Sequence, residues 1–265
     1  MKRATKFTKK AFAASSIVTL ASLVIMPATS LAVGHAEVTT ATSTTGKTSP
    51  FCTKLSSDAS SITSKMGGLQ GKVTQAWVQQ DQKLSTDWQN VDQKVATDRQ
   101  TADTERAADF TKLEAKATTG TQKQAAQTYE AAVNTAVSTR RSAYDVARQT
   151  FRDGVKSAIA TRRSTVDSQT SSFNDSVNSA IATAEASCNS DPSSGTATRT
   201  AFVSSLRTAR QSFTADRKDD SKVGFQVQQL AATRDAVFKA ADQVFQTSLT
   251  TARQTLIQAF GKTSI

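Results

Sequence analysis

The segment 133–187 decides the fold of this chain. It reads VNTAVSTRRSA, YDVARQTFRDG, VKSAIATRRST, VDSQTSSFNDS and VNSAIATAEAS, five blocks of eleven residues without a gap. The blocks begin at Val133, Tyr144, Val155, Val166 and Val177. Eleven residues over three turns is about 3.67 residues per turn, which is close to the natural α-helix and keeps an apolar stripe nearly straight. The repeat therefore predicts one long helix whose partners pack with slight right-handed supercoil or none.

The same 11-residue (hendecad) period runs before and after this segment. The residues that recur at this spacing, here called the seam rows, are Leu55, Met66, Trp77, Trp88, Arg99 and Phe110; Ile62, Val73, Leu84, Val95, Arg106 and Ala117; Tyr129, Arg140, Phe151, Arg162, Phe173 and Ala184; Val227, Phe238, Leu249 and Phe260; and Val223, Arg234, Phe245 and Leu256, together with the five block positions. We expect the packing between helices to depend on nine of their aromatic residues: Trp77, Trp88, Phe110, Tyr129, Tyr144, Phe151, Phe173, Phe238 and Phe245. No segment alternates with a period of two, so strands are not expected. A compact bundle of ordinary amphipathic helices is the alternative, and it predicts shorter periodic runs with several breaks.

The rows before and after the TTGT segment face one another if the chain turns back there. The sequence therefore predicts an antiparallel helical hairpin over 51–188 with its turn near 118–122. The two cysteines, Cys52 and Cys188, fall at the open end of this hairpin, and outside the cytoplasm they are expected to form a disulfide. Two free buried thiols are the alternative. Gly67, Gly68 and Gly71 are expected to break the first helix near its start.

A third long helical segment is predicted over 197–265, after a loop over 189–196. The loop composition, NSDPSSGT, is typical of a connection between helices. Within the third segment the 11-residue frame slips by one residue around RKDDSKVG, so we expect a kink or short turn near 218–224. The predicted fold is thus all-α: a long hairpin with hendecad seams and a third long, kinked helix.

The N-terminus has the three parts of a secretory signal peptide. MKRATKFTKK is basic, 11–26 is apolar, and ATSLA ends at Ala32 as a small-residue cleavage site, with Ala36 as a second site. An uncleaved membrane anchor is the alternative. Residues 1–32 hold five basic and no acidic residues, so their removal lowers the net charge from +11 to +6. The expected location is therefore outside the cytoplasm: periplasmic, extracellular or on the cell surface.

The segment 33–50 is rich in Thr and Ser, which predicts a flexible tail. Within it ATSTTGKT (41–48) satisfies the loosest phosphate-loop pattern. A working phosphate loop needs a strand before it and a helix after it, and neither is expected at this place. We therefore predict no nucleotide site.

Composition argues against an enzyme and against a metal site. The single histidine is His35, so the predicted folded body has no imidazole base or ligand, and two cysteines do not make a tetrahedral zinc site. No pair of carboxylates is marked for acid–base work by its spacing. We predict no catalytic residue, no cofactor and no metal. Nucleic-acid binding is also not expected, because acidic residues are interspersed with the arginine pairs.

Five arginines lie in the seam rows: Arg99, Arg106, Arg140, Arg162 and Arg234. Their stems are expected to pack while the guanidinium groups reach solvent or a carboxylate. In the hairpin Arg99 faces Arg140, which is unfavourable unless acids or water intervene. Arg162 is expected beside Trp77, in a cation–π contact.

These features favour a non-enzymatic extracytoplasmic protein, an elongated helical spacer or docking rod at the cell envelope. We expect a protein partner or self-association there, and membrane contact that is at most peripheral or through an uncleaved anchor. One alternative is a periplasmic holdase, because export, basicity and long helices resemble Skp-type chaperones, which however carry a small β-body. A second is a lipid-surface binder, because the 11- and 22-residue periods resemble those of exchangeable apolipoproteins, although a narrow seam favours packing between helices.

The chain also resembles a group of uncharacterised exported long-helix proteins from ultrasmall candidate-phylum bacteria. The resemblance rests on segments such as KLEAKATT, TFRDGV and AATRDAVFKAADQVFQT and on the two widely spaced cysteines. It implies export and a helical fold, and it implies no activity.

Overall fold

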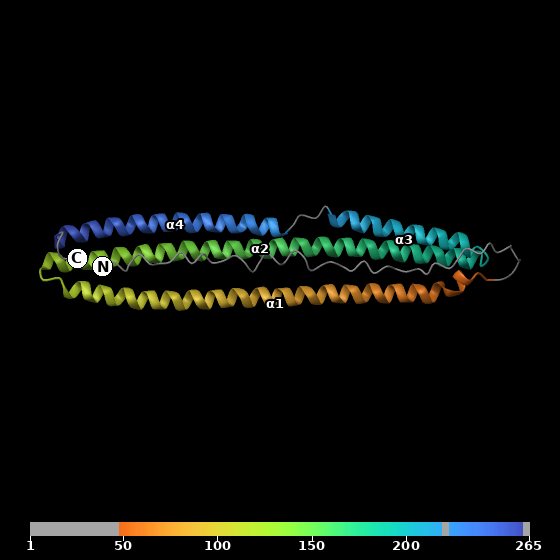
Figure 1. Cartoon of the computed structure of the whole chain (residues 1–265), viewed down its shortest axis with the longest axis horizontal. Helices are drawn as coiled ribbons and strands as arrows, with labels where there is room; N and C mark the ends of the chain where they lie inside the picture. Colours follow the sequence, from red (N-terminus) through yellow and green to blue (C-terminus); the bar gives the residue numbers. More distant parts are fainter. Residues whose placement is uncertain (1–47, 219–222, 262–265) are drawn as a thin grey trace. The chain divides into compact units, whose positions relative to one another are not determined.

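The structure, a computed structural model, describes residues 48–218 and 223–261. Four helices make up this part of the chain: α1 (Pro50–Ala115), α2 (Gly120–Ser190), α3 (Gly195–Lys218) and α4 (Val223–Phe260) (Figure 1). No strand occurs in the described residues, and the all-α prediction is confirmed. The predicted signal peptide, the phosphate-loop-like segment and nearly all of the Thr/Ser-rich segment lie outside the described residues.

Local capping chemistry explains where α1 and α2 begin. Ser49 precedes Pro50, and the Ser49 hydroxyl accepts a hydrogen bond from the Phe51 backbone N–H (3.2 Å). A proline at the first helical position has no N–H to leave unsatisfied. At the start of α2, the Thr119 hydroxyl accepts from the Gln122 N–H (3.2 Å), and the Gln122 side chain accepts from the Thr119 N–H (3.2 Å). This reciprocal pair is a capping box.

Several predicted boundaries need correction. The segment between α1 and α2 is 116–119, at the early edge of the expected turn, and the loop after α2 is 191–194 rather than 189–196. In the third segment α3 ends at Lys218 and α4 begins at Val223, at the place where the sequence predicts a kink or short turn. The glycines of α1 do not break that helix, because it runs from Pro50 to Ala115 without interruption.

The chain divides into two compact units, and α1 and α2 contribute to both. Among the described residues, the first unit consists of 81–158 and 224–261, and the second of 48–80, 159–218 and Val223. Each unit therefore holds three helical segments. The first unit combines parts of α1 and α2 with α4, and the second combines the other parts of α1 and α2 with α3.

In the first unit α4 lies beside the N-terminal part of α2 (Figure 1). A buried cluster unites residues of α1, α2, α4 and the turn: Leu113, Ala117, Ala126, Leu256 and Phe260. Close by, the rings of Phe110 and Tyr129 meet edge to face with centroids 6.2 Å apart. At this end of the first unit, apolar surface of α1, α2 and α4 is buried together.

In the second unit α3 lies beside the C-terminal part of α2 (Figure 1). Its core contains Leu55, Ala59, Val177, Ala180, Ile181, Ala184, Cys188 and Phe202. Aromatic contacts join α3 to both neighbours, with Phe202 6.1 Å from Phe51 and Phe213 5.3 Å from Phe173 between ring centroids. Across both units, every residue of the seam rows is buried or half-buried.

Candidate functional site

The α2–α4 interface of the first unit contains a ladder of two arginines and four aromatic rings. The ladder runs Phe245, Arg140, Tyr144, Phe238, Arg234 and Phe151. The Arg140 guanidinium lies 5.0 Å from the ring centroids of both Phe245 and Tyr144. The Tyr144 and Phe238 rings stack at 4.2 Å. Arg234 then lies 5.8 Å from Phe238 and 4.8 Å from Phe151. Three of these five contacts join α2 to α4, so the ladder helps to fix the register of the two helices.

A hydrogen-bonded triad closes the middle of this ladder. Arg140 Nε donates to Asp242 Oδ1 (2.6 Å), and the Tyr144 hydroxyl donates to the same oxygen (2.6 Å). Arg140 also donates to the Tyr144 oxygen (3.2 Å). Burial, together with the bond to Asp242, raises the pKa of Tyr144 above its usual value. The phenol therefore stays protonated at neutral pH and serves as a fixed donor.

Beside the ladder, α2 and α4 form an open groove of about 850 Å³. It is lined by residues within 128–143 of α2 and 237–255 of α4, nearly all of them Ala, Thr, Ser or Val. Val237 and Val244 are 40% and 57% exposed. Arg140 is the one charged residue of the lining, and its charge is already compensated by Asp242. Apart from Tyr129, Arg140 and Phe245, the groove is lined by small, uncharged side chains.

The α1–α2 interface of the first unit is held by bidentate clamps that repeat every eleven residues. Arg152 donates to both carboxylate oxygens of Asp92 (2.7 and 2.9 Å), and Arg141 does the same to Asp103 (2.6 and 2.9 Å). Hydrogen bonds from Arg141, aided by Arg106, lower the pKa of Asp103 from 3.8 to about 2. The pKa of Asp92 is likewise lowered, chiefly by its bond to Arg152.

Arg152 and Arg141 also donate to backbone carbonyls of α1, each four residues before the aspartate that the arginine binds. Arg152 reaches the carbonyl of Trp88 and Arg141 that of Arg99, both at 3.4 Å. In the second unit Arg163, eleven residues after Arg152, donates to the carbonyl of Trp77 at the same distance, 3.4 Å. Its guanidinium lies 5.7 Å from the Trp77 ring centroid. The cation–π contact that we expected from Arg162 is thus made by its neighbour.

Four of the five seam arginines are paired with acidic side chains. Arg99 donates to both oxygens of Asp145 (2.8 and 2.9 Å), and this lowers the pKa of Asp145. Arg140 is paired with Asp242 in the same way. The positive charges of Arg99 and Arg140, which the hairpin was expected to bring face to face, are therefore both compensated. The remaining partners are Asp103 and Asn134 for Arg106 and the adjacent Asp235 for Arg234.

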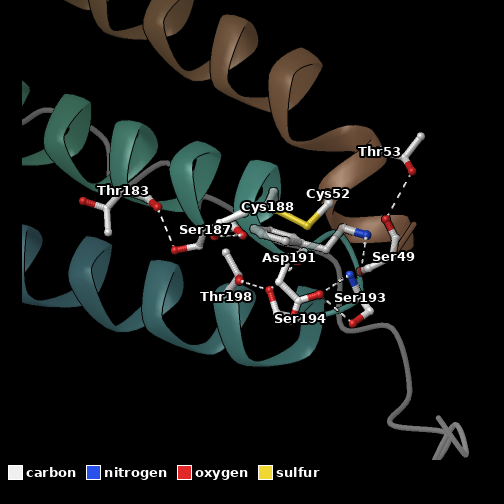
Figure 2. Close-up of a disulfide and its surroundings, with 12 residues drawn as sticks. Ser49, Cys52, Thr53, Thr183, Ser187, Cys188, Asp191, Ser193, Ser194 and Thr198 are labelled. Carbon is white, nitrogen blue, oxygen red and sulfur yellow. Dashed lines mark hydrogen bonds between the residues drawn. A yellow bond between two sulfur atoms is a disulfide. The ribbon is translucent and has the colours of Figure 1, made fainter. Parts of the chain in front are cut away.

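The disulfide predicted from sequence joins Cys52 of α1 to Cys188 of α2, with their Cα atoms 5.4 Å apart (Figure 2). The connection after α2 is bonded to the start of α1 at the same end, because the Ser49 N–H donates to the Pro192 carbonyl (2.8 Å). Asp191 accepts from the Ser193 hydroxyl (2.6 Å) and backbone N–H (2.9 Å), and these bonds lower the Asp191 pKa. The second unit is therefore closed at this end by one covalent bond and a hydrogen-bonded turn.

All nine aromatic residues predicted for packing are buried or half-buried. Phe238 and Phe245 lie with Tyr144 and Phe151 in the ladder. The guanidinium of Arg152 lies over the ring of Trp88, and that of Arg163 lies over the ring of Trp77. Sequence reasoning missed the clamps, although Asp92 and Asp103, like Arg141, Arg152 and Arg163, are spaced by eleven residues. It also missed the groove, whose signal is the absence of charge on one face of each helix.

Within 48–218 and 223–261 no group of three His, Cys, Asp or Glu side chains is placed to hold a metal ion. In the same residues no helix carries a stretch long and apolar enough to cross a membrane. Comparison with protein-family models, with curated proteins and with solved structures finds no match to this chain.

Proposed function

We propose that this protein is a non-enzymatic structural or interaction protein outside the cytoplasm, an elongated helical spacer or docking rod at the cell envelope. The proposal rests on one observation: the ionisable groups with shifted pKa values lie in contacts between helices. Asp92, Asp103 and Asp145 each have a lowered pKa because an arginine of the neighbouring helix binds them. Tyr144, whose pKa is raised, bonds to Asp242 of α4. Shifted pKa values are common at catalytic sites, but here they accompany contacts that hold helices together.

The length of α1 and α2 supports a spacing role. A continuous helix of 66 residues, the length of α1, measures about 99 Å along its axis. A short catalytic or ligand-binding domain does not require helices of that length, whereas a spacer does. The bidentate clamps and the arginine–aromatic ladder are directional contacts, which resist sliding of one helix along another better than apolar contacts alone.

Export is supported by the N-terminal sequence and by the disulfide. Disulfides persist in oxidising compartments and are rare in the cytosol. Cys188 is buried, and no free cysteine remains among the described residues. The predicted cleavage sites give a direct check: the exported chain should begin at Val33 or, with the second site, at Glu37.

The decisive experiment is cross-linking in living cells, followed by mass spectrometry of the captured partner and N-terminal sequencing of the exported chain. The proposal expects an envelope protein, or the chain itself, linked through lysines of the mature body. A variant with Leu20→Lys and Leu23→Lys, which interrupts the apolar core of the signal, is the matched control and should lose these cross-links. Cytosolic partners only, or an intact N-terminus in the cytosol, would contradict the proposal.

Solution scattering tests the spacing role separately. A spacer is expected to have a maximum dimension of at least about 100 Å, set by α1. A radius of gyration of about 18 Å, as for a compact globule of this chain length, would refute it. Suppression of aggregation of an unfolded client by the purified chain, with no envelope partner in cells, would instead favour a holdase.

A further inference from the structure

In the first unit, the groove-lining residues of α2 and α4 together with Val146 form a surface that we call the groove face. Five large apolar residues of the described chain are exposed, and three of them belong to this face: Val146, Val237 and Val244. Val237 and Val244 line the groove itself. Val146, 63% exposed, follows Ala143 and Thr139 of the groove by three and seven residues, so it lies on the same side of α2. Exposed valines of this chain are thus concentrated on one surface.

Around these valines the side chains are small. Ala132, Thr135 and Thr139 stand on α2, and Ala240, Ala241 and Ser248 stand on α4. Small residues between two helices leave holes that a branched side chain of another helix fills, as in knobs-into-holes packing. The face therefore carries both the projecting valines and the holes that would receive them, which makes it complementary to itself.

Charge also points to a second copy as the occupant. The chain has 33 basic and 22 acidic residues, or 28 and 22 without residues 1–32, so two copies carry the same net positive charge and repel one another. The groove face is different, because its one charged residue, Arg140, is neutralised by Asp242 at 2.6 Å. A partner recognised by charge would find no complement there. A second copy that presents the same uncharged face meets no such repulsion.

The area suffices for a weak but specific dimer. The face extends over about 30 Å of helix and is two helices, about 20 Å, wide. It would bury about 600 Å² per copy and about 1,200 Å² in a pair, the lower end of the range for specific interfaces. An interface with two-fold symmetry uses the same patch on both copies, as self-complementarity requires.

We propose that two copies of this chain associate through the α2–α4 groove face, with Val237 and Val244 of each copy inserted among the Ala and Thr residues of the other. The α2 and α4 segments of one copy's first unit would then pack against the same two segments of the partner. The dimer goes beyond the proposed envelope role, because its formation needs neither export nor an envelope partner. Failure of one proposal therefore leaves the other standing.

The test is the molar mass of the purified chain in solution, measured by light scattering and sedimentation equilibrium. We expect a reversible dimer with a dissociation constant of about 10 µM, as suits this area. Val244→Glu should raise the dissociation constant by at least about 100-fold, because two valines leave the interface per dimer and two carboxylates would have to be desolvated. Val78→Glu is the matched control, since Val78 is 51% exposed but lies on α1 in the second unit.

The control variant should dimerise as the parent chain does, and both variants should keep their helical circular dichroism. Higher salt, from about 0.05 to 0.5 M, should strengthen the dimer slightly by screening the repulsion between the basic copies. A parent chain that stays monomeric at about 200 µM would overturn the proposal. So would a dimer that Val244→Glu leaves intact or that Val78→Glu disrupts equally. A monomer that floats with phospholipid vesicles through Val244 would assign the face to lipid instead.

Discussion

Replacing Arg140 by Met tests whether the arginine–aromatic ladder stabilises the first unit. Methionine retains most of the apolar stem and removes the charge. The ion pair with Asp242, whose side chains are 28% and 40% exposed, is worth about 1 kcal/mol at such exposure. Contacts with the rings of Phe245 and Tyr144, both at 5.0 Å, add about 0.5 kcal/mol each. We therefore expect the free energy of unfolding to fall by about 2 kcal/mol.

The two tryptophans make this loss measurable in one unit at a time. Trp88 belongs to the first unit and Trp77 to the second. In a Trp77→Phe background, the fluorescence of Trp88 follows urea unfolding at a residue of the first unit. A loss of about 2 kcal/mol lowers the urea midpoint by about 1 M for a unit of this size.

Two further variants decide how the effect is divided. Lys239→Met removes an exposed charge from α4 and should change stability by less than about 0.5 kcal/mol. Arg140→Lys keeps the positive charge but loses the planar group that lies over the two rings, so it should restore only about half of the loss. If Arg140→Met cost no more than Lys239→Met, the ladder would contribute nothing to stability. Full rescue by lysine would refute the part assigned to the rings.

Three other perturbations test the remaining contacts. Reduction of the disulfide should lower the stability of the second unit by about 2–4 kcal/mol, seen in its tryptophan fluorescence, and leave the first unit unchanged. Replacing a helical glycine by alanine ordinarily adds about 1 kcal/mol of stability, but Gly154→Ala should not, because the added methyl carbon would lie 2.6 Å from Leu230. Gly71→Ala has open space around it and should give most of that gain. Equal shifts of the urea midpoint in the two variants would contradict this packing. The pKa of Asp103 is lowered to about 2, below the unfolded value, so its contribution to stability is present above about pH 4 and is lost as the pH falls toward 2. Asp103→Asn should flatten the acid side of the urea midpoint against pH, and an unchanged curve would show that the clamp is not responsible.

The sequence predicted the helices and the cysteine pair because both depend on local or strictly repeated information. An 11-residue period matches three turns of helix, so Val133, Val155 and Val177 fall on one face whatever else the chain does. The predicted break at Gly67 was wrong for a physical reason. Each glycine costs a helix only about 1 kcal/mol, and packing of Ile62 and Met66 against the core of the second unit offsets that cost.

The contacts beside the seam could not be predicted in the same way. Arg162 and Arg163 differ by about 100° around the helix axis, and which of them covers Trp77 depends on the rotation of α2 against α1. The period of the sequence gives the width of the seam but not that rotation. The same ambiguity hid the clamps, since Arg141 and Arg152 follow the seam residues Arg140 and Phe151 by one position. Tertiary packing also decides which part of α2 lies beside α3 and which part lies beside α4, and the period of the sequence does not contain this information.

The ladder and the groove face are two sides of one helix pair, and Arg140 belongs to both. Because its charge is already neutralised by Asp242, Arg140 contributes to the fold and little to the face that a second copy would meet. Val244 is the converse, since it is 57% exposed and its replacement removes little from the folded unit. Arg140→Met should therefore lower stability and leave the dimer nearly unchanged, while Val244→Glu should disrupt the dimer and leave stability nearly unchanged. Were both variants to impair both properties together, the inner and outer sides of the α2–α4 pair would be one coupled structure, and neither the ladder nor the face would have the separate role assigned to it.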